Sequence, residues 1–167
     1  KTGKTDFALS NLKTALQLDT ENKAFQSQVY ALQGDIYINQ NNFQTAKVAF
    51  EKAINLDPDN YFVMNNYAYY LALRDDDLLK AEKYAETAAN AMPTSASITD
   101  TYAYVLFKLQ KYVLAQKWIE KAIQNNTTNS GVYLARYGDI LYMQGNKDAA
   151  LGQWQKAKDL GNGSHML

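Results

Sequence analysis

Apolar and small residues recur along this chain with the spacing of one helical face. Ala46, Phe50 and Ala53 lie four and then three residues apart, which places them on the same side of an α-helix. The pattern returns after each further 34 or 35 residues, at Ala81, Ala85 and Ala88, at Ala115, Ile119 and Ala122, and at Ala150, Trp154 and Ala157. Each copy predicts a helix with one buried face.

A second series marks another helix in every copy. Gly34, Ala68, Ala103 and Gly138 lie 34, 35 and 35 residues apart, with apolar or aromatic residues three or four positions around them. These segments predict helices that include 30–37, 64–71, 99–106 and 134–141. Two helices in each period form a helical hairpin, and hairpins repeated at this period predict a helical solenoid.

The repeat resembles the tetratricopeptide repeat. That family sets an aromatic, Gly or Ala, and Tyr on one helix, and Ala, an aromatic, Ala and Pro on the next. The best match is Tyr30, Gly34, Tyr37, Phe43, Ala46, Phe50, Ala53 and Pro58. The departures are Thr99 and Thr127, in place of an aromatic and a Pro, and single-residue insertions near 74–77 and 127–130.

The resemblance implies an all-α fold, a right-handed α-solenoid of about four and a half hairpins. We expect residues 1–167 to form one array, with full repeats at 27–60, 61–95, 96–130 and 131–162 and a tail at 163–167. Residues 1–22 look like the second half of a truncated repeat, so we expect the chain to be a fragment of a longer protein. Residues 23–26 add about one helical turn before the first full repeat, and Gly161 is expected to end the last helix.

The truncated helix at about 5–18 lacks its own hairpin partner. We therefore expect Phe7, Leu9 and Leu12 to present apolar surface and to cause weak self-association.

Charge and composition exclude several classes of function. The 17 basic and 17 acidic residues balance, which gives no electrostatic case for nucleic acid. No run approaches the ~18 apolar residues of a membrane span. The absence of cysteine excludes thiol catalysis and disulfides. Because the sequence resembles bacterial repeat proteins, many of which are exported, the expectation leans towards the bacterial cell envelope, with the cytoplasm left open.

The sequence offers little for catalysis. Its single histidine, His165, lies in the tail, so no histidine triad, imidazole base or multi-histidine metal site is expected. Asp75, Asp76 and Asp77 lack the regular ligand spacing of a calcium loop, and we expect a solvated turn in which Asp77 caps the next helix. The chain is therefore predicted to be no enzyme and to need no cofactor or metal.

The aromatic residues divide into two sets. One set occupies repeat positions that pack helix on helix, and we expect a structural role for Tyr30, Tyr37, Phe43, Phe50, Tyr67, Tyr102, Tyr112, Tyr137 and Trp154. In the resembling family, the positions of the other set face the concave groove, and here they hold Phe62, Tyr69, Tyr104, Phe107 and Tyr142. Polar groups alternate with this second set at Gln28, Asp35, Asn39, Asn65, Asp100, Lys108 and Asp139.

This mixture of rings and hydrogen-bonding groups is typical of a peptide-binding groove. We predict a partner-binding site of Asn65, Tyr69, Asp100, Tyr104, Phe107, Asp139 and Tyr142. A clamp for a terminal carboxylate is not expected, because Ser97 and Thr101 stand where such domains offer Lys and Arg, and only Arg136 is basic. The carboxylates favour a basic or donor-rich segment. The alternative is that the tyrosine rings merely fill a tight superhelix.

The predicted function is a non-catalytic scaffold or adaptor that binds a peptide or helix of a partner protein. Two alternatives remain open. The segment could be the substrate-selecting arm of a larger enzyme, or an architectural scaffold in an envelope or secretion assembly. The architectural scaffold would use the ends of the array and its convex face, including Tyr84 and Trp118.

Overall fold

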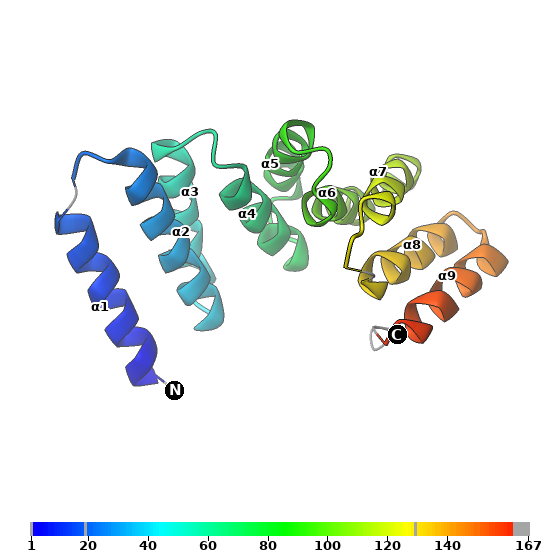
Figure 1. Ribbon diagram of the computed structural model, residues 1–167, viewed down its shortest axis with the longest axis horizontal. Helices are drawn as coiled ribbons and strands as arrows, with labels where there is room; N and C mark the ends of the chain where they lie inside the picture. The colour runs from blue at the N-terminus through cyan, green and yellow to red at the C-terminus, as the bar shows by residue number, and fades with distance from the viewer. Residues whose placement is uncertain (1, 19, 129, 162–167) are drawn as a thin grey trace. The chain divides into compact units, whose positions relative to one another are not determined.

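The computed structural model describes residues 2–18, 20–128 and 130–161, and this part of the chain is all α-helical (Figure 1). It divides into two compact units, residues 1–67 and 68–167. The expectations for the tail at 163–167, including His165, lie outside the described residues. Within the described residues, no helix is long and apolar enough to cross a membrane.

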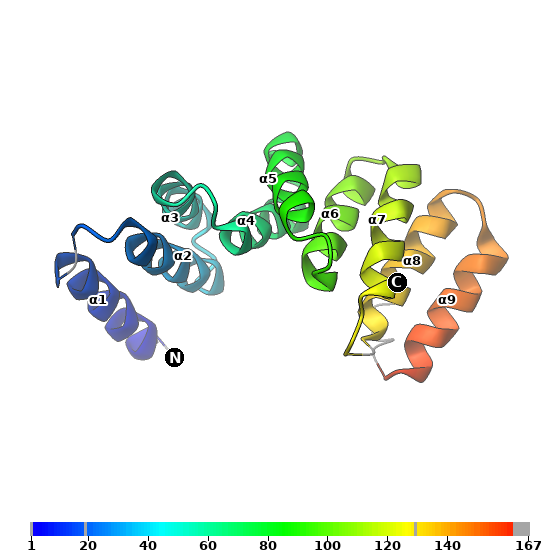
Figure 2. The same ribbon diagram turned by 45° about the horizontal axis from the view of Figure 1, so that its top comes forward.

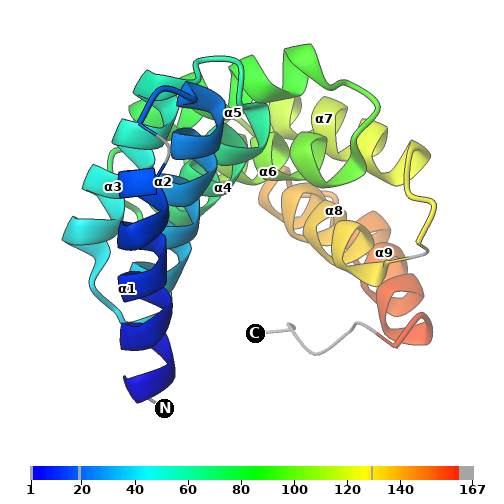
Figure 3. The ribbon, with the colours of Figure 1, turned by 60° about the vertical axis from the view of Figure 1, so that its left-hand side comes forward.

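The first unit holds α1 (Thr2–Leu18), α2 (Lys23–Asn39), α3 (Phe43–Leu56) and the start of α4 (Tyr61–Leu73). Helix α2 packs along α3, and α1 packs against α2 (Figure 3). Helix α2 has 17 residues and α4 has 13, which confirms the extra turn predicted at residues 23–26. Phe7 on α1 is 69% exposed, whereas Leu9 and Leu12 are partly covered, and self-association through this helix stays a prediction.

The second unit holds the rest of α4 and then α5 (Leu78–Ala91), α6 (Ala96–Lys108), α7 (Tyr112–Gln124), α8 (Gly131–Met143) and α9 (Lys147–Asp159). Helices α6 and α7 form one hairpin, and α8 and α9 form the next (Figure 2). The predicted all-α class and its helical hairpins are confirmed.

Each hairpin turns through the same backbone conformation. A left-handed residue with φ between 52° and 87° follows the first helix at Asn41, Asp75, Gln110 and Gly145. The next residue donates its N–H to a carbonyl five positions earlier, as in the bond from Lys111 to Leu106. The second repeat carries one extra turn residue, Asp77, before α5, as the predicted insertion requires.

Short polar side chains cap several helix starts. The carboxylate of Asp77 accepts a hydrogen bond from the backbone N–H of Lys80 at 3.2 Å, which confirms its predicted capping role. Asn22, Asn42 and Asn60 cap α2, α3 and α4 in the same way. At the other end of the chain, Gly161 has a φ of 79° directly after α9, which confirms it as the helix stop.

Small residues on the first helix of a hairpin leave room for an aromatic ring on the second. A Cβ atom at Gly34 would lie 2.7 Å from the ring of Phe50, and one at Gly138 would meet the indole of Trp154. Ala68 and Ala103, at the equivalent positions, have no exposed surface. The small-residue series of the sequence therefore marks close helix packing.

A tyrosine and a glutamate join successive repeats. The hydroxyl of Tyr67 donates to Glu51 at 3.1 Å, and that of Tyr137 donates to Glu120 at 2.8 Å. Burial raises the pKa of Tyr102 to about 12, and Glu86, which is also hydrogen-bonded to this hydroxyl, contributes to the shift. Tyr67 and Tyr102 thus bury their rings while their hydroxyls stay paired, and Tyr137 makes the same kind of pair from a partly covered position.

Candidate functional site

One groove in the second unit gathers aromatic, aliphatic and charged side chains from three first helices. Its cavity volume is about 270 Å³. The lining residues come from α4, α6 and α8: Tyr69, Leu73, Tyr104, Phe107, Val132, Ala135, Arg136 and Asp139.

The repeat brings these residues to one surface. Tyr69, Tyr104 and Asp139 are each 35 residues apart, so they occupy the same place on successive first helices. Phe107 lies one turn after Tyr104 on α6, and Arg136 lies one turn before Asp139 on α8. Equivalent positions of three repeats therefore form a continuous wall.

Aromatic contacts hold the centre of the groove. The rings of Tyr69 and Tyr104 lie 5.8 Å apart between their centroids. The guanidinium of Arg136 stacks over Tyr104, with its central carbon 4.3 Å from the ring centroid. Phe107 packs against Tyr112 of α7 at 5.8 Å. The rings are thus fixed by neighbouring helices and present a rigid surface.

Arg136 is also anchored to α6. Its Nη1 lies 3.2 Å from the carboxylate Oδ2 of Asp100 and donates to the backbone carbonyl of Asp100 at 3.3 Å. Together with the ring of Tyr104, these contacts hold the guanidinium between α6 and α8. The positive charge of Arg136 is therefore compensated within the protein.

Asp100 is a buried carboxylate, only 8% exposed. Its second oxygen, Oδ1, is buried and accepts no hydrogen bond from the residues that the structure describes. Burial raises the pKa of this carboxyl to about 6, although the charge of Arg136 opposes the shift. Tyr133 on α8 lies within the electrostatic reach of Asp100, and its own pKa is raised mainly by burial.

Asp139 has a structural contact and a groove-facing position. Its Oδ1 accepts a hydrogen bond from the indole N–H of Trp154 at 3.0 Å, and the same N–H also lies 3.2 Å from the carbonyl of Ala135. Burial raises the pKa of Asp139, while the Trp154 hydrogen bond and the charge of Arg136 oppose that shift. The side chain thus fixes Trp154 and lines the groove.

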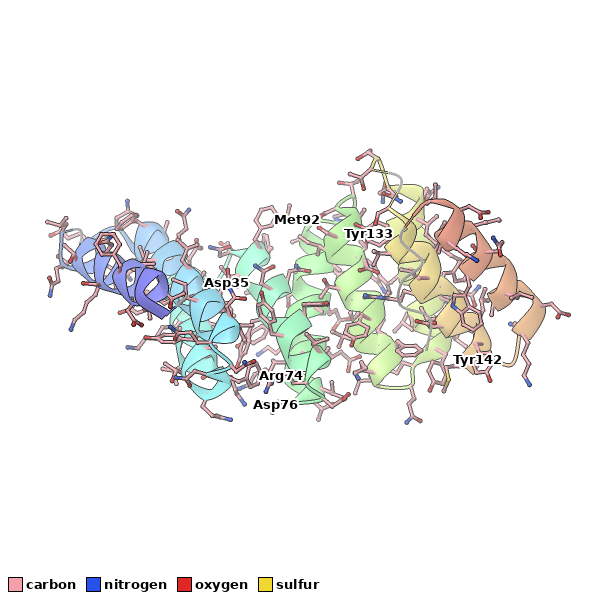
Figure 4. All side chains as sticks on the ribbon, turned by 90° about the horizontal axis from the view of Figure 1, so that it is seen from below. Asp35, Arg74, Asp76, Met92, Tyr133 and Tyr142 are labelled. Atoms are coloured by element: carbon pink, nitrogen blue, oxygen red, sulfur yellow. The ribbon has the colours of Figure 1, made fainter. Side chains whose placement is uncertain are left out.

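The three-aspartate turn serves the fold and the edge of the groove. Asp75 forms an ion pair of 2.7 Å with Lys108, whose ammonium lies 5.9 Å from the ring of Tyr104. Asp77 caps α5, and Figure 4 marks Arg74 and Asp76 in the same turn. Within the described residues there is no group of three or more metal-ligating side chains.

The structure brings together four of the seven residues predicted as a partner site. Tyr69, Tyr104, Phe107 and Asp139 line the groove. Asp100 lies one turn before Tyr104 but is buried against Arg136 instead of lining the cavity.

The other two predicted residues lie elsewhere. Tyr142, at the opposite end of α8 from Tyr133 (Figure 4), is 49% exposed and packs against Trp154 at 5.7 Å. Asn65 belongs to the first unit, where its side-chain amide donates to Asn66 at 3.3 Å.

Sequence reasoning missed four groove residues: Leu73, Val132, Ala135 and Arg136. Arg136 had a usable signal, because it lies 36 residues after Asp100 and so on the neighbouring first helix with opposite charge. The three apolar residues carried no such signal, since an apolar residue on a first helix equally fits the core.

Comparison with known proteins identifies the repeat. Residues 27–60 and 49–83 match two models described as tetratricopeptide repeat. The human tetratricopeptide repeat protein 7B is 28% identical over 124 residues, which is 74% of this chain and 14% of that protein. The chain thus spans about a seventh of the length of this relative.

Solved structures share the fold. PilF of Pseudomonas aeruginosa superposes with a TM-score of 0.80 at 20% identity, over 99% of this chain and 72% of that one. MamA of Desulfovibrio magneticus RS-1 gives 0.80 at 17% identity, over 99% and 90%. YrrB, described as a protein of this repeat type with an unusual peptide-binding site, gives 0.77 at 19% identity, over 99% and 81%. These likenesses show the fold, an array of about four and a half repeats.

Proposed function

We propose that this chain, in which residues 27–60 and 49–83 match models of the tetratricopeptide repeat, is an interaction scaffold of that repeat type. Its second unit holds an extended peptide or helix of a partner protein in the groove between α4, α6 and α8. Tyr69, Tyr104 and Phe107 are the apolar anchors. YrrB, which shares the fold, is described as having a peptide-binding site, and this supports the same class of ligand here.

The observation that carries the proposal is the arrangement of three rings on two helices around an open cavity. Rigid aromatic side chains contribute much of the binding energy at protein interfaces, because little conformational entropy is lost when they are covered. A cavity of about 270 Å³ admits one or two side chains rather than a large cofactor. The groove therefore fits a peptide whose apolar side chain lies on the rings of Tyr69 and Tyr104.

The test begins with selection of random 12-residue peptides, displayed on phage, against the purified protein. Fluorescence anisotropy then measures the affinity of a selected synthetic peptide for the wild type and for Tyr69→Ala and Tyr104→Ala. Each substitution is expected to weaken binding by more than ~1 kcal/mol, as for interface hot spots.

Leu79→Ala and Val113→Ala are the matched controls. These residues are 74% and 70% exposed on the second helices α5 and α7 and do not line the groove. Circular dichroism establishes that all four variants fold. Weaker binding by the Leu79 and Val113 variants, with the tyrosine variants unchanged, would move the function to the second helices, as an architectural scaffold requires.

A further inference from the structure

The charged side chains around the groove include one more carboxylate than the cations pair with, and this excess of negative charge bears on which partner binds. Arg136 is paired with Asp100 at 3.2 Å, and Lys108 is paired with Asp75 at 2.7 Å. Both cations nearest the groove are thus already compensated. Asp139 is the carboxylate left over, because its only described polar partner is the neutral indole of Trp154.

The position of Asp139 makes its charge available to a ligand. It lines the cavity beside Arg136, yet no ammonium or guanidinium of the described residues lies within 4.0 Å of its carboxylate. Its second oxygen, Oδ2, is not used by the Trp154 contact. A half-buried carboxylate in this state has lost part of its hydration, while the nearby guanidinium of Arg136 lies beyond ion-pair distance, so a donor supplied by the ligand would offset that loss.

Asp100 adds to the same excess of acceptors. Its Oδ1 is buried and accepts no hydrogen bond from the described residues, while its Oδ2 holds Arg136. The Asp100, Arg136 and Asp139 cluster therefore carries two carboxylates against one guanidinium. The guanidinium is held on three sides, by the carboxylate and carbonyl of Asp100 and by the ring of Tyr104.

We propose that the groove selects a basic peptide segment, in which a Lys or Arg side chain pairs with Asp139 while a neighbouring apolar side chain lies on Tyr69 and Tyr104. The inference rests on the proposed function and names its class of partner. An acidic segment would have to displace Asp100 from Arg136 and would leave a buried carboxylate unpaired.

The test uses the same phage selection, performed in parallel on the wild type and on Asp139→Asn. Asparagine keeps an oxygen in place to accept the Trp154 hydrogen bond, and near-ultraviolet circular dichroism verifies that the indole environment is unchanged. Wild-type selection is expected to enrich Lys or Arg next to an apolar residue. Asp139→Asn should lose that enrichment and bind a selected basic peptide roughly 5–20-fold more weakly.

Asp148→Asn is the control, since Asp148 is an exposed carboxylate in the first turn of α9 and does not line the groove. It should retain the enrichment and the affinity.

Two results would overturn this inference and leave the proposed function standing. One is that the selected peptides require Tyr69 and Tyr104 but show no preference for Lys or Arg. The other is that they bind Asp139→Asn as well as they bind the wild type. Peptides enriched in Asp or Glu would overturn this inference in favour of Arg136 as the selecting residue. A peptide affinity that is unchanged in both Tyr69→Ala and Tyr104→Ala would overturn the proposed function, and this inference with it.

Discussion

Two surfaces of α8 behave differently, although their residues alternate along one helix. On the packing side, Gly138 admits the indole of Trp154, and Tyr137 pairs its hydroxyl with Glu120. On the groove side, Arg136 is paired with a buried carboxylate, and Asp139 forms no ion pair within the described residues.

The two surfaces differ in how many of their contacts are made within the protein. The packing side repeats contacts that are closed within the fold: a glycine faces a ring in the first and last full hairpins, and a tyrosine pairs with a glutamate of the preceding helix. The groove side varies between repeats, and next to it the buried Oδ1 of Asp100 accepts no hydrogen bond from the described residues.

The largest expected effect lies on the packing side. Gly138→Ala would place a methyl group against the Trp154 indole and should destabilise the protein by about 1–3 kcal/mol. Gly152→Ala on the same hairpin has no atom within 4 Å of its added carbon and should stabilise by about 0.5–1 kcal/mol through helix propensity. Urea denaturation measures the free energy of unfolding of both variants. Equal changes at the two glycines would show that Gly138 is not needed for close packing against Trp154.

The buried carboxylate next to the groove gives a pH-dependent effect of intermediate size. Because the pKa of Asp100 is raised from 3.8 to about 6, the folded state binds the proton more tightly than the unfolded state. Its contribution to the free energy of unfolding is therefore greatest below about pH 4 and declines as the pH rises to about 6. Arg136 and Tyr133 of α8 are the charged or titratable groups identified next to it.

Asp100→Asn should remove this decline, on the order of 1–2 kcal/mol between pH 4 and pH 6, while a side-chain amide oxygen remains to accept from Arg136 in place of Oδ2. Urea denaturation of both proteins at pH 4, 5, 6 and 7 provides the comparison. Parallel pH curves for the wild type and the variant would show that Asp100 is not a destabilising carboxylate.

The smallest effect concerns the hairpin turns. Gln110 occupies the left-handed position with a φ of 60°, where glycine stands in the last repeat as Gly145. Gln110→Gly should stabilise by about 0.5–1 kcal/mol because a residue with a Cβ is strained there. Gly145→Ala should destabilise by about 1 kcal/mol. Thermal unfolding of the two variants should shift in opposite directions, and a loss of stability in Gln110→Gly would refute the shared turn.

The sequence predicts the packing side well, for a physical reason. Gly34 and Phe50 have the same spacing as Gly138 and Trp154, because both hairpins bring these two positions into contact. The cap at Asp77 and the stop at Gly161 follow from local backbone chemistry that needs no distant partner.

The groove is predicted only in part. Tyr69 and Tyr104 were identified because repeat positions place them on one wall. The pairing of Asp100 with Arg136 depends on how closely α6 approaches α8, which spacing along the chain does not specify. Tyr142 has the same residue type and helix face as the groove tyrosines, yet it lies beside Trp154. Residue type and periodicity therefore locate a surface, while contacts between helices decide which side chains remain available.

Site-specific photocrosslinking can test whether a peptide lies between α4, α6 and α8. A benzophenone amino acid is placed at Phe107, which lines the groove, or at Val113, which is 70% exposed on α7. Each protein is irradiated with a phage-selected synthetic peptide, and the crosslinked product is measured by mass spectrometry. We expect a covalent product from position 107 and none from position 113, whereas a product from position 113 alone would show that the peptide binds the second helices and not the groove.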